Sequence, residues 1–396
     1  MTPRIRKKNI SKKYLEQKIS AGSILFTILL GFMGGAIFGQ ALFQQNSDNV
    51  IPFTMVYSSE KATWIAESAI LFQEYWEEKR TQDPTLKAIQ LDFQPYGSGD
   101  SLIALLNGET EPVVWSPASN IWVPLLNAKW NQMTEKEHII APNYTRLIYS
   151  PVVIATWENF YQEHPFEGFH DLHDLIVENP GLVKLAHTDP RSSNSGFMAT
   201  VMMVSSILNM DPAAITIDNL ADPVVIQWLS EIESAAVFYG KSTGFLAKYM
   251  RDRGPEALQV AVLYENLVQD YSQLAEEKYG QKIIAVYPTE GSLFSDHPFC
   301  ILDADWVSEE QKMVADEYLK FLSQKELILK AIQTGFRPID VNLLDESDIQ
   351  EVYQLSFNME HGVTADPGVI IELHPPTDGL VIARIPDLWL LTRNSE

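Results

Sequence analysis

Apolar and polar positions in the stretch after residue 50 predict a strand followed by a helix. IPFTMVY, residues 51–57, is mostly apolar, as a buried strand requires, and the turn YSSEKAT that follows it is polar. From there to about residue 80, apolar side chains recur every three to four positions, the spacing of one helix face. The residues on this face are Ile65, Ala69, Phe72 and Trp76, and the opposite face is mainly acidic.

The same unit of strand, polar turn and helix recurs along the chain. Residues 86–109 and 111–127 repeat it, and RLIYSPVVIATW, residues 146–157, is a further apolar strand. Strands and helices that alternate at this spacing predict an α/β fold with a mostly parallel sheet covered by helices. A second α/β region follows, in which we expect helices through residues 254–279 and one long helix over residues 308–335.

The N-terminal part has the pattern of a membrane anchor. Residues 23–43 carry no charged side chain, and 21 residues in a helix span about 30 Å, the thickness of a hydrocarbon core. Residues 1–22 hold seven basic residues and one acid, so this segment is expected on the cytoplasmic side. We predict a single-pass signal anchor, a linker at residues 44–50 and an exported domain after it. Cleavage near Ala41 is the alternative, and it would leave the same domain secreted.

Charge and cysteine content exclude several classes of function. Without residues 1–22 the chain has 22 basic and 51 acidic residues, a net charge of −29, so phosphate repulsion disfavours a nucleic-acid partner. The only cysteine, Cys300, allows neither an internal disulfide nor a paired-cysteine metal site. The motifs of P-loop nucleotide hydrolysis, zinc proteolysis and α/β-hydrolase chemistry are missing from the sequence, and we expect no cofactor.

Four strand-to-helix turns are rich in small hydroxyl residues and glycine. In open parallel sheets such turns lie at the carboxyl ends of the strands, where ligands bind. The unpaired N–H groups and the dipole at a helix start can hold an anion without any basic side chain. Taken singly, each turn is better explained as an ordinary N-cap, whereas four together favour a shared cleft. The four turns contain Ser58 with Ser59, GSGDS at 97–101, Ser116 with Ser119, and RSSNSG at 191–196.

Taken in order, these turns and their flanks resemble those of a known family. The resemblance to bacterial extracellular solute-binding proteins is carried by FTMVYSSEKATWI, YGSGDSLIALLNGETEPVVWSPASNIWVPLLN, YSPVVIAT, LAHTDPRSSNSGF, FYGKSTGF, VLYENLVQDY, VYPTEGS and GFRPID. It implies the two-lobed type II periplasmic-binding fold, closest to the molybdate-binding-like group. Lobe 1 would comprise residues 51–150 with 290–396, and lobe 2 residues 151–289. Residues 357–396 are similar to the segment that, in one branch, joins the binding domain to a von Willebrand factor type A domain, which this sequence does not carry.

The resemblance also implies where a ligand binds. By family position, the first three turns would face a cleft from lobe 1 and the turn at 194–196 would face it from lobe 2. Ligand binding would close the lobes about a hinge. Arg191 either points into this cleft and pairs with an anion, or lies outward as a solvated turn residue. The candidate ligand-binding residues are Ser58, Ser59, Ser98, Gly99, Ser116, Arg191, Asn194, Ser195, Gly196, Tyr239, Thr243 and Glu265.

Two other kinds of chemistry fit parts of the sequence. Three short motifs follow one another in the order found in penicillin-binding enzymes, although the third carries an extra residue. They are SSEK at 58–61, SSN at 192–194 and KSTG at 241–244. HDLHD at 170–174 offers histidines and aspartates for a metal, and it equally fits the surface of an amphipathic helix. A cation in the cleft would find oxygen ligands in Asp100, Asp189 or Glu265.

The sequence therefore favours a solute-binding protein rather than an enzyme. We expect it to capture a small ligand between two lobes, with an oxyanion as the leading class because hydroxyls and helix N-termini suit one. Its partners would be an ABC-type permease or a sensing system at the cytoplasmic membrane, with the binding domain outside. The alternative belongs to a different functional class, an adhesion or assembly module that has the same fold but no longer binds a ligand.

Overall fold

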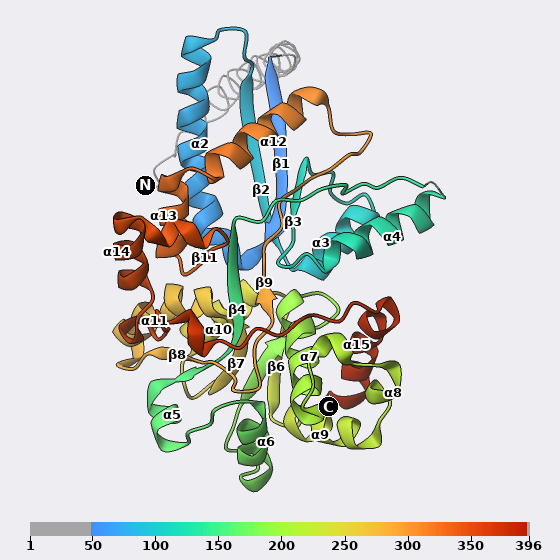
Figure 1. Ribbon diagram of the computed structural model, residues 1–396, viewed down its shortest axis with the longest axis vertical. Helices are drawn as coiled ribbons and strands as arrows, with labels where there is room; N and C mark the ends of the chain where they lie inside the picture. Colours follow the sequence, from blue (N-terminus) through green and yellow to red (C-terminus); the bar gives the residue numbers. More distant parts are fainter. Residues whose placement is uncertain (1–48, 136, 394–396) are drawn as a thin grey trace, which may run out of the picture. The chain divides into compact units, whose positions relative to one another are not determined.

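The computed structural model describes residues 49–135 and 137–393, whose path is drawn in Figure 1. By their contacts these residues form two units. The smaller contains residues 49–51 and 77–90, and the larger contains all the others and every site discussed below. The predicted anchor at 23–43 and the segments on either side of it, up to residue 48, lie outside the described residues. Among the residues that are described, no helix is long and apolar enough to cross a membrane.

The first sheet has the strand order β10-β3-β1-β2. Strands β1 and β3 run parallel, with Tyr57 opposite Ser116, so both strands end at the same edge of the sheet. Strand β10 is antiparallel to β3 and places Cys300 opposite Trp115. The bounds of these strands are Val50–Ser58 (β1), Ala88–Tyr96 (β2), Val114–Ser116 (β3) and Cys300–Ile301 (β10).

The second sheet is mixed, which corrects the prediction of a mostly parallel sheet in each lobe. Strands β5, β6 and β7 run parallel, but β4 is antiparallel to all four of its neighbours, β7, β8, β9 and β11. Strand β4 pairs with β9 and β11 through residues 148–151 and with β7 and β8 through residues 152–157. The strands are Ile148–Trp157 (β4), Leu185–Thr188 (β5), Ala236–Gly240 (β6), Val260–Tyr264 (β7), Ile283–Val286 (β8), Phe294–Ser295 (β9) and Arg337–Pro338 (β11).

Helices follow most strands directly, as the alternating pattern predicts (Figure 1). The α-helices named below are Ala62–Gln82 (α2), Ser98–Leu106 (α3), Trp122–Thr134 (α4), Glu158–Glu163 (α5), Phe169–Glu178 (α6), Asn194–Leu208 (α7), Ile217–Leu220 (α8), Pro223–Glu233 (α9), Thr243–Arg253 (α10), Glu265–Tyr279 (α11), Glu309–Leu322 (α12), Lys325–Gln333 (α13), Ser347–Ser356 (α14) and Gly379–Thr392 (α15). The 3₁₀ turn Ser59–Lys61 (η1) joins β1 to α2.

Two predicted helices differ from the structure. The stretch 254–279 contains the buried strand β7 before α11, because an apolar run such as VAVLY has no periodicity that separates strand from helix. The long helix over 308–335 is two helices, since Gln324 between α12 and α13 has an extended backbone. Its predicted start is confirmed: Ser308 and Gln311 form a capping box.

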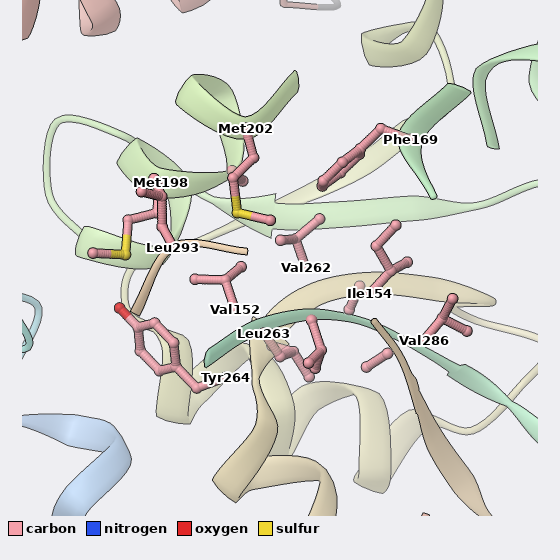
Figure 2. Close-up of a cluster of buried hydrophobic side chains, with 14 of the residues drawn as sticks. Val152, Ile154, Phe169, Met198, Met202, Val262, Leu263, Tyr264, Val286 and Leu293 are labelled. Atoms are coloured by element: carbon pink, nitrogen blue, oxygen red, sulfur yellow. The ribbon is translucent and has the colours of Figure 1, made fainter. Parts of the chain in front are cut away.

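The largest buried apolar cluster surrounds the second sheet. Figure 2 shows Val152 of β4 and Val262 of β7 below Met198 and Met202 of α7, and Ile154 of β4 further along, toward Val286 of β8. Met198, Met202 and Val152 are almost completely removed from water, so α7 is anchored by packing and its first turn is held in a fixed place.

The C-terminal segment packs against the second sheet's helices. Helix α15 contacts α7, α8 and α9, all of which fall in the range predicted for lobe 2, although residues 290–396 were expected in lobe 1. Helix α14 instead contacts α13. Helices α14 and α15 thus pack against different parts of the fold, while the lobe boundaries themselves stay a prediction.

Candidate functional site

The turn after β1 is buried and contains two ionisable side chains. Glu60 and Lys61 are 5% and 1% exposed, so Lys61 is not the solvated residue that its place in a first helical turn suggests. The Lys61 ammonium donates hydrogen bonds to the Ser116 carbonyl oxygen (2.9 Å) and to the Ser116 hydroxyl (2.7 Å). Lys61 thus fixes the turn after β3, and burial lowers its pKa to about 8.

This lowered pKa predicts a pH dependence of stability. Between pH 8 and 10.5 the unfolded chain keeps the Lys61 proton and the folded chain releases it, so the free energy of unfolding rises with pH. The Lys61 contribution over this window amounts to about 3 kcal/mol. Urea unfolding of the wild type and of Lys61→Met at several pH values would measure it. We expect the wild-type curve to rise relative to the variant, and parallel curves would contradict the assignment.

Glu60 lies against a buried histidine from the segment between β9 and β10. The Glu60 Oε1 and His297 Nδ1 atoms are 3.3 Å apart, and both side chains are almost fully buried. Burial acts to raise the pKa of Glu60, but His297 and Lys61 outweigh it and the pKa lies below its ordinary value. Burial lowers the pKa of His297, so this ring is neutral near pH 7. The turn therefore carries a carboxylate balanced by the Lys61 ammonium.

Two turns of the first sheet touch turns of the second sheet directly. The Ser59 hydroxyl donates a hydrogen bond to the Ser242 hydroxyl (2.7 Å) and accepts one from the Gly244 N–H (3.2 Å). At the start of α3, the N–H groups of Gly99 and Asp100 donate to the Ser192 carbonyl oxygen at 2.8 and 3.1 Å. The unpaired N–H groups of this helix start are thus satisfied by the facing turn.

A group of polar side chains from both predicted lobes lies beside these contacts. We call it the interlobe cluster: Trp122, Asn194, Ser195, Thr243, Tyr264 and Ser295. The Asn194 side chain accepts from the Trp122 indole N–H (2.9 Å) and donates to the Tyr264 hydroxyl (2.8 Å) and the Ser295 hydroxyl (3.0 Å). Thr243 donates to the Ser195 hydroxyl at 2.8 Å. Burial strongly raises the pKa of Tyr264, which keeps its proton as a hydrogen-bond donor.

Glycines permit the close approach of these turns. A Cβ atom on Gly99 would lie 2.3 Å from the Arg191 carbonyl oxygen, and one on Gly244 would lie 2.7 Å from the Ser59 carbonyl oxygen. Gly196 has a different role, because its Cβ would lie 1.9 Å from the Thr188 carbonyl oxygen within the same half of the fold. Gly99 and Gly244 therefore allow the facing turns to lie in contact, whereas Gly196 allows α7 to pack closely on β5.

Other candidate residues have partners elsewhere in the fold. The Tyr239 hydroxyl donates to Glu233 (2.7 Å), whose other oxygen contacts buried His187 at 2.9 Å. The Glu265 carboxylate is paired with Arg337. The Arg191 side chain is half exposed and forms an ion pair with Asp189 (2.5 Å). The structure thus brings Ser59, Gly99, Asn194, Ser195 and Thr243 together, whereas it places Tyr239 and Glu265 in buried pairs.

Ser58, Ser98 and Ser116 support the same turns from within the first half of the fold. All three side chains are buried. The Ser98 hydroxyl accepts from the Ala118 N–H (3.0 Å), which ties the start of α3 to the turn after β3. Together with the Lys61–Ser116 bonds, this contact makes the first three turns one connected structure.

The facing turns are in direct contact through the Ser59–Ser242 and Gly99–Ser192 hydrogen bonds. A ligand that bound between them would have to replace these bonds, so the turns of the two halves would have to separate. A cavity of about 10 Å³ against Lys61, Ser116 and His297 has room for roughly one water molecule, and the facing turns do not line it.

The metal and hydrolase alternatives gain no support from the contacts. His173 is buried, stacks on Trp228 with ring centroids 4.7 Å apart and hydrogen-bonds Glu231 at 2.8 Å, so its ring takes part in the packing of α6 on α9. Within residues 49–135 and 137–393, no three His, Cys, Asp or Glu side chains are placed to hold a metal ion. The hydrogen bonds of Lys61 go to Ser116 and Pro117, not to the serine three positions before it.

Comparison with known proteins identifies the family. Residues 53–337 match the sequence model of the bacterial extracellular solute-binding proteins. The chain belongs to this family. The match includes every turn of the site, from Ser58 to Glu265, and it ends before α14 and α15. A search of curated protein sequences gives no match.

Solved structures of solute-binding proteins share the fold at low sequence identity. The sulfate-binding protein of Mycobacterium tuberculosis H37Rv is 15% identical with a TM-score of 0.53, and the alignment covers 77% of this chain and 91% of that one. A fructose-6-phosphate-bound periplasmic binding protein of Actinobacillus pleuropneumoniae is 13% identical with a TM-score of 0.55, covering 86% and 98%. An alpha-D-tagatose-bound protein of Thermotoga lettingae is 10% identical with a TM-score of 0.58, covering 87% and 93%.

Several residues of this site were not found from the sequence. No pattern in the sequence singles out Glu60, His297 or Tyr264 as part of the site. The fold alone brings Trp122 and Ser295 into the cluster. One signal was available: Ser242 precedes Thr243 in the turn KSTG, which follows a strand as the four hydroxyl-rich turns do.

Proposed function

We propose that this solute-binding protein captures a small oxyanion between its two lobes and presents it to an ABC-type permease. The observation that carries the proposal is the convergence of the turns from both halves on the interlobe cluster. Asn194 alone links α4, β7 and β9 through its side-chain amide. A ligand that replaced these direct contacts would meet hydroxyl groups and helix N-termini on both sides.

The chemistry of the turns supports an oxyanion. The Gly99 and Asp100 N–H groups already bind one oxygen acceptor, the Ser192 carbonyl, and an anion's oxygen would suit the positive end of α3 better. Hydroxyls of Ser59, Ser195 and Thr243 are further donors. Among proteins with this fold, those of M. tuberculosis and A. pleuropneumoniae bind sulfate and fructose-6-phosphate, which both carry oxyanion groups.

The proposal also covers the location of the protein at the membrane. The family is extracellular, and we propose that residues 23–43 anchor the chain in the cytoplasmic membrane with the binding domain outside. In that position the domain would meet the outer face of a permease.

One observation favours the second candidate, an adhesion or assembly module that binds no solute. The facing turns satisfy each other's hydrogen-bonding groups directly, as in the Ser59–Ser242 and Gly99–Ser192 contacts. A module that remains closed would keep these contacts permanently, whereas a solute-binding protein must open them.

A melting-shift screen separates the two candidates. The full chain in lipid nanodiscs would be heated with molybdate, tungstate, sulfate, phosphate, divalent metals and small sugars. A ligand that binds only the folded state raises the melting temperature by mass action. A rise with at least one oxyanion is the expected result. No rise with any compound would favour the module, and a rise with a sugar or metal alone would overturn the oxyanion class.

Two serines provide a test at the level of residues. Replacing Ser58 and Ser195 together by alanine should weaken binding of the active oxyanion by about tenfold, since each hydroxyl contributes roughly one hydrogen bond. Folding should change little, and the melting temperature without ligand is the control. Loss of folding in both single variants would show that the two serines are needed for the fold and would contradict a role in ligand binding alone.

A further inference from the structure

A second, apolar pocket lies beside the turns. It has a volume of about 630 Å³, within the size range of small-molecule sites. Helices α3 and α4 form one wall, the Pro190–Arg191 turn and Phe197 form another, and α15 forms the third. Helix α15 lies outside residues 53–337, so this third wall lies beyond the segment matched to the family, whereas the other two walls lie within it.

The lining of the pocket is apolar with basic groups at its edge. The apolar lining includes Leu102 and Ile103 of α3, Leu125 of α4 and Ile382 of α15, and Ile103 remains 50% exposed. Half-exposed apolar side chains that gather around a cavity indicate a binding surface more often than isolated ones do.

Charge narrows the class of ligand. Among the described residues that line the pocket, the charged ones are Lys129 and Arg191, and both are basic. This is notable in a chain with a net charge of −23. Lys129 is exposed at the end of the α4 wall, and Arg191 is half exposed with its guanidinium 5.4 Å from the centre of the Trp389 ring.

We propose that this pocket binds an amphipathic organic anion, with its apolar part between α3, α4 and α15 and its anionic group near Lys129 and Arg191. The pocket borders the interlobe cluster, because Trp122 belongs to both, but the other five residues of the cluster do not line it. The inference therefore goes beyond the proposed function. Because its walls come from both halves of the fold, an occupant would contact α3 and α15 at once and favour the closed arrangement.

Two fluorescent probes that share a ring system test the pocket. 1-Anilinonaphthalene-8-sulfonate carries one anionic group, and N-phenyl-1-naphthylamine lacks it. Each would be titrated into the full chain in lipid nanodiscs, with empty nanodiscs subtracted. Ala383→Trp fills the pocket from α15, and Leu380→Trp, on the same helix but outside the lining, is the matched control.

We expect Ala383→Trp to weaken sulfonate binding at least about tenfold and Leu380→Trp to leave it unchanged. Lys129→Gln with Arg191→Gln should weaken sulfonate binding about fivefold and leave the uncharged probe unaffected. The control for charge is Lys320→Gln with Arg384→Gln, two exposed basic residues outside the pocket.

Equal binding in Ala383→Trp and the wild type would overturn the site. Two results would overturn the assignment of the ligand as an anion. One is equal affinity of the wild type for both probes, and the other is an equal loss of affinity for both probes in the Lys129→Gln, Arg191→Gln variant. The Ser58→Ala, Ser195→Ala variant should bind both probes normally, so failure of the oxyanion proposal would be visible separately.

Discussion

Replacing Glu265 by alanine should destabilise the protein by about 3–5 kcal/mol, because it leaves a buried arginine without its counter-ion. Arg337 donates two hydrogen bonds of 2.7 Å to the Glu265 carboxylate, and the two side chains are 1% and 0% exposed. The same guanidinium donates to the Thr364 carbonyl oxygen and the Tyr353 hydroxyl. It therefore joins β11, α11 and the C-terminal segment, and its loss should loosen all three.

A double-mutant cycle measures this pair. Urea unfolding of Glu265→Ala, Arg337→Met and the double variant gives the coupling free energy. The double variant should lose clearly less free energy of unfolding than the two single variants lose together, because it leaves no unpaired charge buried. Tyr353→Phe is a milder control, because it removes one hydroxyl and keeps the ion pair. Strictly additive losses would contradict the account of this pair.

Gly99→Ala and Gly244→Ala should weaken ligand binding by about tenfold to a hundredfold while leaving each half of the fold intact. Each glycine lies in the first turn of a helix, where alanine is a better helix former. The added methyl group would meet only the facing turn, at 2.3 Å from the Arg191 oxygen or 2.7 Å from the Ser59 oxygen. The closed arrangement is therefore penalised, and an open one is not.

Gly379→Ala is the matched control, since it also lies at a helix start and its Cβ would have no neighbour within 4 Å. Calorimetric titration with the oxyanion found by the melting-shift screen would measure the affinities. Wild-type affinity in Gly99→Ala and Gly244→Ala would show that closure of these turns plays no part in binding.

The sequence identifies the turns because local rules determine them. A strand, a few Ser and Gly residues and a helix with a capped start can be recognised without tertiary contacts, and the carboxyl ends of parallel strands share one edge. Ser59, Gly99 and Asn194 were found in this way. The same rules cannot show that Ser59 contacts Ser242, because 183 positions separate the two residues.

Buried charge could not be predicted in the same way. Lys61 stands in a first helical turn, where lysine is normally solvated, and its burial depends on carbonyl and hydroxyl oxygens of Ser116, 55 positions further along. Glu265 follows a strand like a ligand-binding residue, and only the fold reveals Arg337 beside it. The antiparallel pairing of β4 in the second sheet was not predicted, because an apolar run such as VVIATW occurs in buried strands of either direction.

The distance between the two halves of the fold tests the central claim that the protein closes around a solute. Spin labels at Glu109→Cys and Asp218→Cys, both exposed, would report it by double electron–electron resonance, and buried Cys300 would stay unlabelled. In the full chain, we expect the oxyanion from the melting-shift screen to shift the distances to one short, narrow distribution. Gly99→Ala should keep the longer distances at the same ligand concentration. Identical distributions with and without the ligand would contradict the account.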